Sequence, residues 1–146
     1  MKRILVIHGP NLNLLGEREP NIYGFDSIEE INKTLEKIAK KNRFSLKIIQ
    51  SNHEGEIVEV IGRAKEKFNA IIINPAAYTH TSIAIRDAIS AVGIPTIEVH
   101  LSNIYGREEF RQKSLIAPVS KGQICGFGKN SYVLALLGII ELLKNE

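Results

Sequence analysis

Two patterns of hydrophobic and polar positions alternate along the chain. Short runs rich in β-branched residues predict strands, and longer runs with apolar residues every three or four positions predict amphipathic helices. The predicted strands span residues 3–8, 44–50, 70–74, 95–100 and 122–127. The predicted helices span residues 27–42, 56–67, 79–91 and 131–144. Because strands and helices alternate, the pattern predicts one α/β domain over residues 1–146.

The strand and helix order predicts where a ligand would bind. We expect a flavodoxin-like fold, a five-stranded parallel sheet of order 2-1-3-4-5 with helices on both faces. In such sheets, ligands bind beyond the carboxyl ends of the strands, here after His8, Asn74 and His100. Two connections at this edge, residues 9–25 and 101–121, are much longer than the ~2–6 residues that suffice. Long loops in compact domains are commonly functional.

Composition narrows the class of protein further. Of the 146 residues, 44% are hydrophobic and 24% are charged, which excludes a disordered chain and a multi-span membrane protein. A single cysteine excludes an intrachain disulfide framework and a Cys-rich zinc site. The net charge of +3 is too small to indicate nucleic acid and suits a small anionic ligand. The apolar runs are too short for a signal peptide or a membrane span, so we expect a cytoplasmic protein.

The first long connection carries polar groups with two interpretations. Asn11, Arg18 and Tyr23 could be a turn former, a surface side chain and a packed ring. Together, at the ligand-binding edge, they favour a functional loop. Its glycines lack the spacing of a phosphate-binding loop or a dinucleotide fingerprint.

The third strand and its helix add three candidates. Asn74 can donate and accept hydrogen bonds, which suits an oxygenated ligand. Thr79 is predicted to cap the following helix, with His80 in its first turn. Asp87 would then share the face of His80 two turns away, at ~10 Å. A solvated histidine and a solvated aspartate are the structural alternatives.

The fourth strand ends with a carboxylate and an imidazole on one face. Positions i and i+2 of a strand point the same way, so Glu98 can orient His100 and stabilise its protonated form. A structural ion pair is the alternative. Arg107 and Arg111 are four residues apart and would point the same way on a helical turn. They could equally be solvated partners of neighbouring glutamates.

The sequence lacks the residue patterns that several kinds of catalysis require. The chain has no Gly-x-Ser-x-Gly elbow, no metal-ligand spacing and no lysine in an apolar setting. We therefore expect no serine nucleophile, no metal site and no Schiff base. A response regulator would need acidic residues where His8 and Asn74 stand.

Six blocks of the sequence resemble one known family. Residues 9–24, GPNLNLLGEREPNIYG, closely resemble the signature of type II 3-dehydroquinate dehydratases. The blocks QSNHEG (50–55), NPAA (74–77), HTS (80–82), EVHLSN (98–103) and REEFR (107–111) are similar in order and spacing. The resemblance covers essentially the whole chain. It departs at His8, Ala76 and Gly106, where the family usually has Asn, Gly and Ala.

The resemblance implies an activity and an assembly. The activity is the reversible loss of water from 3-dehydroquinate to give 3-dehydroshikimate, through an enolate and without a cofactor. The pathway would be the shikimate pathway, towards chorismate and the aromatic amino acids, or else quinate breakdown. The assembly would be a homo-dodecamer built from trimers, in which Asp87 reaches the active site of a neighbouring subunit.

The resemblance also assigns catalytic roles. Tyr23 would be the base. A free tyrosine has a pKa near ~10, so it needs positive neighbours to be ionised at neutral pH, and Arg18 together with Arg107 would supply them. Arg18 would also stabilise the transition state, and Asn11 would hold a water against the enolate oxygen. His100, oriented by Glu98, would protonate the departing hydroxyl.

The remaining roles concern substrate binding. The substrate carboxylate would be held by the Asn74 side chain, the Leu101 and Ser102 backbone amides and the Ser102 hydroxyl. His80 and Arg111 would bind the ring hydroxyls.

Two other functions remain possible from sequence. A non-catalytic α/β module could bind a small carboxylate through Asn74, Ser102 and Arg111, but it would leave Tyr23 and Arg18 without a role. A flavodoxin-type FMN protein would need a Ser/Thr-rich phosphate loop, and the first loop offers Pro, Asn and Leu instead. Turnover of 3-dehydroquinate would distinguish the dehydratase from the non-catalytic module. A colourless purified protein would exclude the FMN protein.

Overall fold

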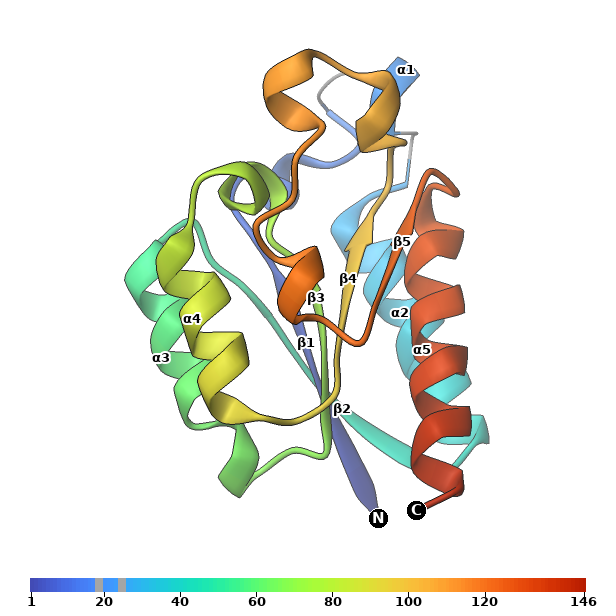
Figure 1. The fold of residues 1–146 in the computed structure, drawn as a ribbon. Helices are drawn as coiled ribbons and strands as arrows, with labels where there is room; N and C mark the ends of the chain where they lie inside the picture. Colours follow the sequence, from blue (N-terminus) through green and yellow to red (C-terminus); the bar gives the residue numbers. More distant parts are fainter. Residues whose placement is uncertain (18–19, 24–25) are drawn as a thin grey trace.

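Five parallel strands form the centre of the molecule (Figure 1). The computed structural model describes residues 1–17, 20–23 and 26–146, and only the backbone of Pro20 and Tyr23. The strands are β1 (Lys2–His8), β2 (Phe44–Gln50), β3 (Ala70–Asn74), β4 (Thr96–His100) and β5 (Gly122–Cys125). Their order is β2-β1-β3-β4-β5, which confirms the predicted flavodoxin-like sheet.

Helices cover both faces of this sheet (Figure 1). The covering helices are α2 (Ile28–Lys41), α3 (Glu54–Gly62), α4 (Ile83–Val92) and α5 (Lys129–Lys144). The short helix α1 (Pro20–Tyr23) lies above the sheet in the view of Figure 1. Ile4 and Val6 of β1 pack in the core shared with α2 and α5. Leu5 and Ile7, pointing the other way, pack in the core shared with α3 and α4. Strands buried on both faces read as continuous apolar runs, which is why β1 and β3 were recognisable from sequence.

The start of α4 differs from the prediction. Residues 76–80 form a 3₁₀ turn, and α4 begins only after Ser82, whose hydroxyl accepts the Ile85 N–H at 2.9 Å. Thr79, the predicted cap, is buried, and its hydroxyl has no hydrogen-bond partner within the described part of the chain. His80 therefore precedes the helix that carries Asp87, and the predicted common face is wrong.

Other boundaries shift by a few residues. The predicted helix 56–67 begins at Glu54 and ends at Gly62, followed by a separate 3₁₀ turn at Ala64–Glu66. The long connection after β4 contains three 3₁₀ turns: Ile104–Gly106, Glu109–Arg111 and Ala117–Val119. Arg107 and Arg111 thus do not share a helix. Within the described ranges, no helix is long and apolar enough to cross a membrane.

Candidate active site

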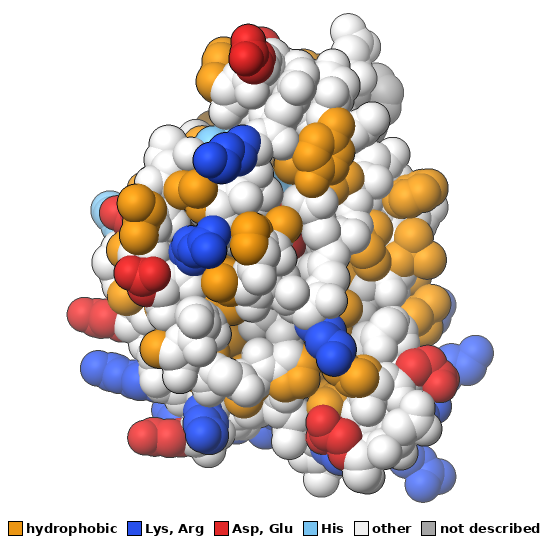
Figure 2. All heavy atoms as spheres, viewed as in Figure 1, with side chains coloured by type: hydrophobic (Ala, Val, Ile, Leu, Met, Phe, Trp, Pro, Cys, Tyr) orange, Lys and Arg blue, Asp and Glu red, His pale blue; other side chains and the backbone are white. Residues whose placement is uncertain are grey.

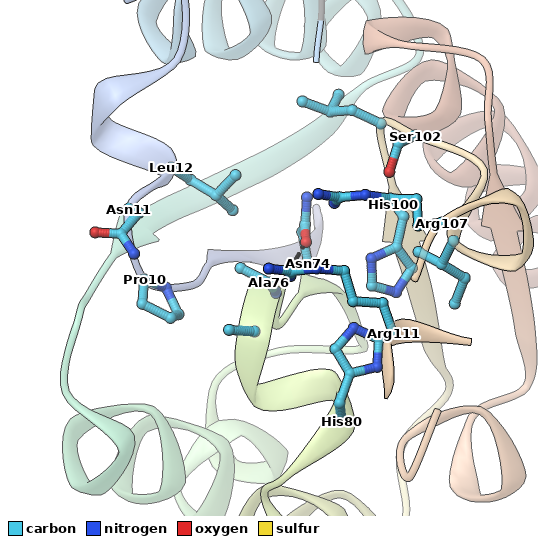
Figure 3. Close-up of a pocket in the computed structure, with 13 residues that line it drawn as sticks. Pro10, Asn11, Leu12, Asn74, Ala76, His80, His100, Ser102, Arg107 and Arg111 are labelled. Carbon is cyan, nitrogen blue, oxygen red and sulfur yellow. Dashed lines mark hydrogen bonds between the residues drawn. The ribbon is translucent and has the colours of Figure 1, made fainter. Parts of the chain in front are cut away.

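A pocket of about 140 Å³ lies beyond the carboxyl ends of β1, β3 and β4 (Figure 3). Its lining consists of Pro10, Asn11, Leu12, Asn74, Ala76, Ala77, His80, His100, Leu101, Ser102, Ile104, Arg107 and Arg111. Eight of these are residues that the sequence singled out, and they come from three separate segments. Arg18 and the side chain of Tyr23 lie outside the described residues. Glu98 stands behind His100, and Asp87 is exposed on α4, away from the pocket lining.

The pocket is basic and polar. Figure 3 shows Arg107 and Arg111 extending toward Asn74, with His80 below Arg111. None of the described residues that line the pocket is acidic. Such a lining favours a small anionic ligand that carries oxygen acceptors.

Backbone contacts fix the loop that opens the pocket. The Gly9 N–H donates to the Asn74 carbonyl at 2.8 Å, joining the ends of β1 and β3. A Cβ on Gly9 would lie 2.6 Å from the Pro75 carbonyl oxygen, so only glycine fits. Asn11 has a left-handed backbone, and its N–H donates to the Asn52 side chain at 2.9 Å. The segment after β2 thus anchors the loop that carries Asn11.

His100 forms a buried wall of the pocket, and Glu98 lies behind it. Both side chains point to one face of β4, and the Glu98 carboxylate is hydrogen-bonded to His100 Nε2. Glu98 is fully buried and His100 is nearly so. Because Nε2 faces Glu98, Nδ1 is the ring nitrogen that can meet a ligand. Ser114 and Gln123, which sequence reasoning missed, also hydrogen-bond to this carboxylate.

Three basic side chains of the lining are held by contacts with neighbouring residues. His80 Nδ1 donates to the Lys113 carbonyl at 2.8 Å, which leaves Nε2 as an acceptor for a ligand. Arg111 Nε donates to Glu108 at 3.1 Å, and Arg107 Nε lies 3.8 Å from the same carboxylate. A hydrogen bond to its own backbone, and then Arg111, lower the pKa of Glu108. The glutamate therefore braces both arginines beside the pocket.

The three departures from the family pattern have different surroundings. His8 lies outside the pocket lining and hydrogen-bonds to Tyr132 and Asn32. Ala76 lines the pocket with a left-handed φ of 53°, and its N–H donates to Asn74 Oδ1 at 3.0 Å. A Cβ on Gly106 would meet only the Asn103 side chain, no closer than 3.6 Å, so alanine also fits there.

The sheet and its pocket define an α/β protein with a polar site for a small anion at the carboxyl edge of the strands. A sequence model of the family described as dehydroquinase class II matches residues 2–140. The chain belongs to this family.

The chain is similar to 3-dehydroquinate dehydratases over nearly its full length. The chain is 60% identical to the 3-dehydroquinate dehydratase of Caldicellulosiruptor bescii, covering 98% of this chain and 99% of the relative. It is 58% identical to that of Trichodesmium erythraeum, covering 98% and 95%. The type II dehydroquinase structure from Butyrivibrio crossotus superposes with a TM-score of 0.93 at 46% identity, covering 96% and 97% of the two chains.

Proposed function

We propose that this protein removes water from 3-dehydroquinate to give 3-dehydroshikimate, as a step of the shikimate pathway. The observation that carries the proposal is His100 in the wall of a basic pocket, paired with Glu98 behind it, in a chain of the dehydroquinase family. The substrate is a carboxylate with ring hydroxyls and a ketone, which matches that lining. We place the reaction in the cytoplasm, a location that cell fractionation would test.

The first step is removal of the proton beside the ketone. Such a proton is weakly acidic, so the step needs a strong base and stabilisation of the enolate. We assign the base to Tyr23 as phenolate and the neighbouring positive charge to Arg18 and Arg107. The assignment of Tyr23 and Arg18 rests on the family motif at residues 9–24. Asn11 lines the pocket, and we assign it to holding a water against the enolate oxygen.

The second step is loss of the hydroxyl. His100 in its protonated form donates the Nδ1 proton to the hydroxyl, which departs as water. The electron pair of the enolate forms the new carbon–carbon double bond and restores the ketone. Glu98 compensates the imidazolium charge, because its carboxylate bonds to the other ring nitrogen.

Binding groups surround these two centres. We assign the substrate carboxylate to the Asn74 amide, the Leu101 and Ser102 backbone N–H groups and the Ser102 hydroxyl. We assign the ring hydroxyls to His80 and Arg111. All five residues line the same pocket, which supports the assignment.

Turnover of 3-dehydroquinate tests the proposal. The product carries a double bond conjugated to its ketone, so its formation raises the ultraviolet absorbance. We expect catalytic formation of this product by the purified protein without added metal or cofactor. Calorimetric binding of the substrate with no product would instead support a non-catalytic carboxylate-binding module.

We further propose a dodecamer of trimers in which Asp87 reaches a neighbouring site. Asp87 is exposed and away from its own pocket, so it is available to a second subunit. Hydrophobic side chains gather over α5 (Figure 2), where Leu134 and Leu137 are each 43% exposed. Exposed apolar surface of this kind is typical of subunit contacts.

Complementation tests the shared site. We expect Asp87→Ala and Tyr23→Phe each to be impaired, and a mixture to regain activity after subunit exchange. Mixed interfaces can pair an intact Tyr23 with an intact Asp87 from another chain. Light scattering gives the mass of the assembly. A fully active monomer would refute both the assembly and the role of Asp87.

A further inference from the structure

We propose that Ser114 and Gln123 are positioning residues for the Glu98–His100 pair. They hold Glu98 as a hydrogen-bond acceptor and thereby fix which ring nitrogen of His100 faces the substrate. The inference rests on the proposed function and adds two residues to it. Neither residue lines the pocket, so both act through Glu98.

The Ser114 hydroxyl has one available direction for its hydrogen. Its oxygen accepts the N–H groups of Ile116 at 3.1 Å and Ala117 at 2.9 Å. A hydroxyl has two lone pairs and one hydrogen, so these two contacts leave only the hydrogen to be placed. The Glu98 oxygens lie 2.8 and 3.0 Å away, and they receive it. The turn at residues 114–117 thus forces Ser114 to act as a donor to Glu98.

The Gln123 amide is oriented in a similar way. Gln123 lies beside Glu98 in the register of β4 and β5, and its Nε2 donates to Glu98 Oε2 at 3.0 Å. Its Oε1 accepts the hydroxyl of Tyr105 at 2.7 Å. Rotation of the amide by 180° would place Oε1 against the carboxylate, oxygen facing oxygen. The sheet register and Tyr105 therefore keep an N–H group directed at Glu98.

These contacts determine the state of His100. The Glu98 carboxylate is fully buried, and a buried carboxylate is stable only when donors surround it. With Ser114 and Gln123 as donors, Glu98 is held as an acceptor, and His100 Nε2 must carry a hydrogen. Nδ1 is then directed at the pocket, where the proposed mechanism needs it. Loss of either donor frees the carboxylate to rotate, and the imidazole loses its fixed orientation.

Ser114→Ala and Gln123→Met test the proposal by separating the two steps of the reaction. We expect each substitution to lower kcat for dehydration on the order of tenfold to a hundredfold. This factor corresponds to the free energy of a hydrogen bond to a charged group. KM should stay within about twofold, because neither side chain contacts the substrate. In D₂O, the exchange of the hydrogen beside the ketone should be retained, because Tyr23 performs that step. The ratio of exchange to dehydration should therefore rise.

Three controls separate this role from general damage. Ser114→Thr retains the hydroxyl and should restore much of kcat. Ser120→Ala removes a nearby hydroxyl that donates to the Ile116 carbonyl rather than to Glu98, and it should keep the wild-type ratio. Thermal unfolding checks that each variant is folded. If Ser114→Ala does not fold, Gln123→Met alone decides.

The outcomes are distinct. Equal loss of exchange and dehydration, or unchanged kcat in both variants, would overturn the role of Ser114 and Gln123. An inactive wild-type protein would instead refute the proposed function. A raised exchange ratio with restored kcat in Ser114→Thr would establish the inference.

Discussion

His8 Nδ1 lies 2.8 Å from the Tyr132 hydroxyl, and both side chains are fully buried. His8 Nε2 donates to Asn32 Oδ1 at 2.8 Å, so Nδ1 accepts the hydrogen of Tyr132. Burial lowers the pKa of His8 from 6.5 to about 4 and raises that of Tyr132. The histidine at this position is therefore a neutral structural group that joins β1 to α5.

This pair predicts a loss of stability in acid. The unfolded chain binds a proton at His8 near pH 6.5, whereas the folded chain resists protonation until about pH 4. The contribution of neutral His8 to the free energy of unfolding is complete above pH 6.5 and is lost as the pH falls towards 4. Between pH 7 and 4.5 the expected loss of unfolding free energy is about 2–3 kcal/mol. Urea unfolding at both pH values should show a larger loss for the wild type than for His8→Asn. Equal losses would contradict this role of His8.

Gly9 should not tolerate a side chain. In Gly9→Ala the new methyl would meet the Pro75 and Asn74 carbonyls, at 2.6 and 2.9 Å. Both are backbone atoms at the end of β3, so the sheet edge must shift, at a cost of about 1–3 kcal/mol. Gly55→Ala is the matched control, because a Cβ there meets nothing within 4 Å. That change, inside α3, should instead stabilise the fold by about 0.5 kcal/mol. Chemical denaturation measures both, and equal effects would refute the steric account.

Ala76 should be a strained position. Its φ of 53° is a left-handed conformation that costs an L-residue about 1 kcal/mol. We expect Ala76→Gly to raise the free energy of unfolding by up to about 1 kcal/mol, the strain being partly offset by the freedom of glycine in the unfolded chain. A clear loss of stability would show that the Ala76 methyl packs better than its backbone conformation suggests.

Tyr23 should be needed for the chemistry and not for binding. Tyr23→Phe keeps the ring and removes the ionisable oxygen. We expect kcat to fall about a hundredfold to ten-thousandfold, with KM little changed, because the lost group acts in the transition state. Steady-state kinetics give both values. Near-normal turnover would assign the base to another residue.

A borohydride experiment tests for covalent chemistry. The enolate mechanism forms no Schiff base, so borohydride added with substrate should leave activity intact and add no mass to the protein. Mass spectrometry that found a reduced adduct on a lysine would overturn the mechanism.

The sequence predicted the sheet more accurately than the network behind the site. The alternation of strands and helices predicted the parallel sheet and its order. Burial on both faces left a clear apolar pattern in β1 and β3. The start of α4 was misplaced because Thr79, Thr81 and Ser82 all carry hydroxyls that could cap a helix, and only tertiary packing chooses among them.

The partners of Glu98 were harder to see from sequence. Ser114 lies in an irregular connection, 16 residues from Glu98, and no periodic pattern links the two. Gln123 could have been found, since adjacent parallel strands β4 and β5 place it beside Glu98 once their register is known. Polar networks between strands and loops depend on such registers, which a single sequence defines poorly.

The rate of 3-dehydroquinate dehydration by the wild type and His100→Asn tests the account most directly. Asparagine cannot supply the proton that His100 donates from the pocket wall. At saturating substrate, the wild type should form the conjugated product, and His100→Asn should be slower by at least about a hundredfold. Equal rates in the two proteins, or no product with the wild type, would contradict the assignment of this pocket as the dehydratase active site.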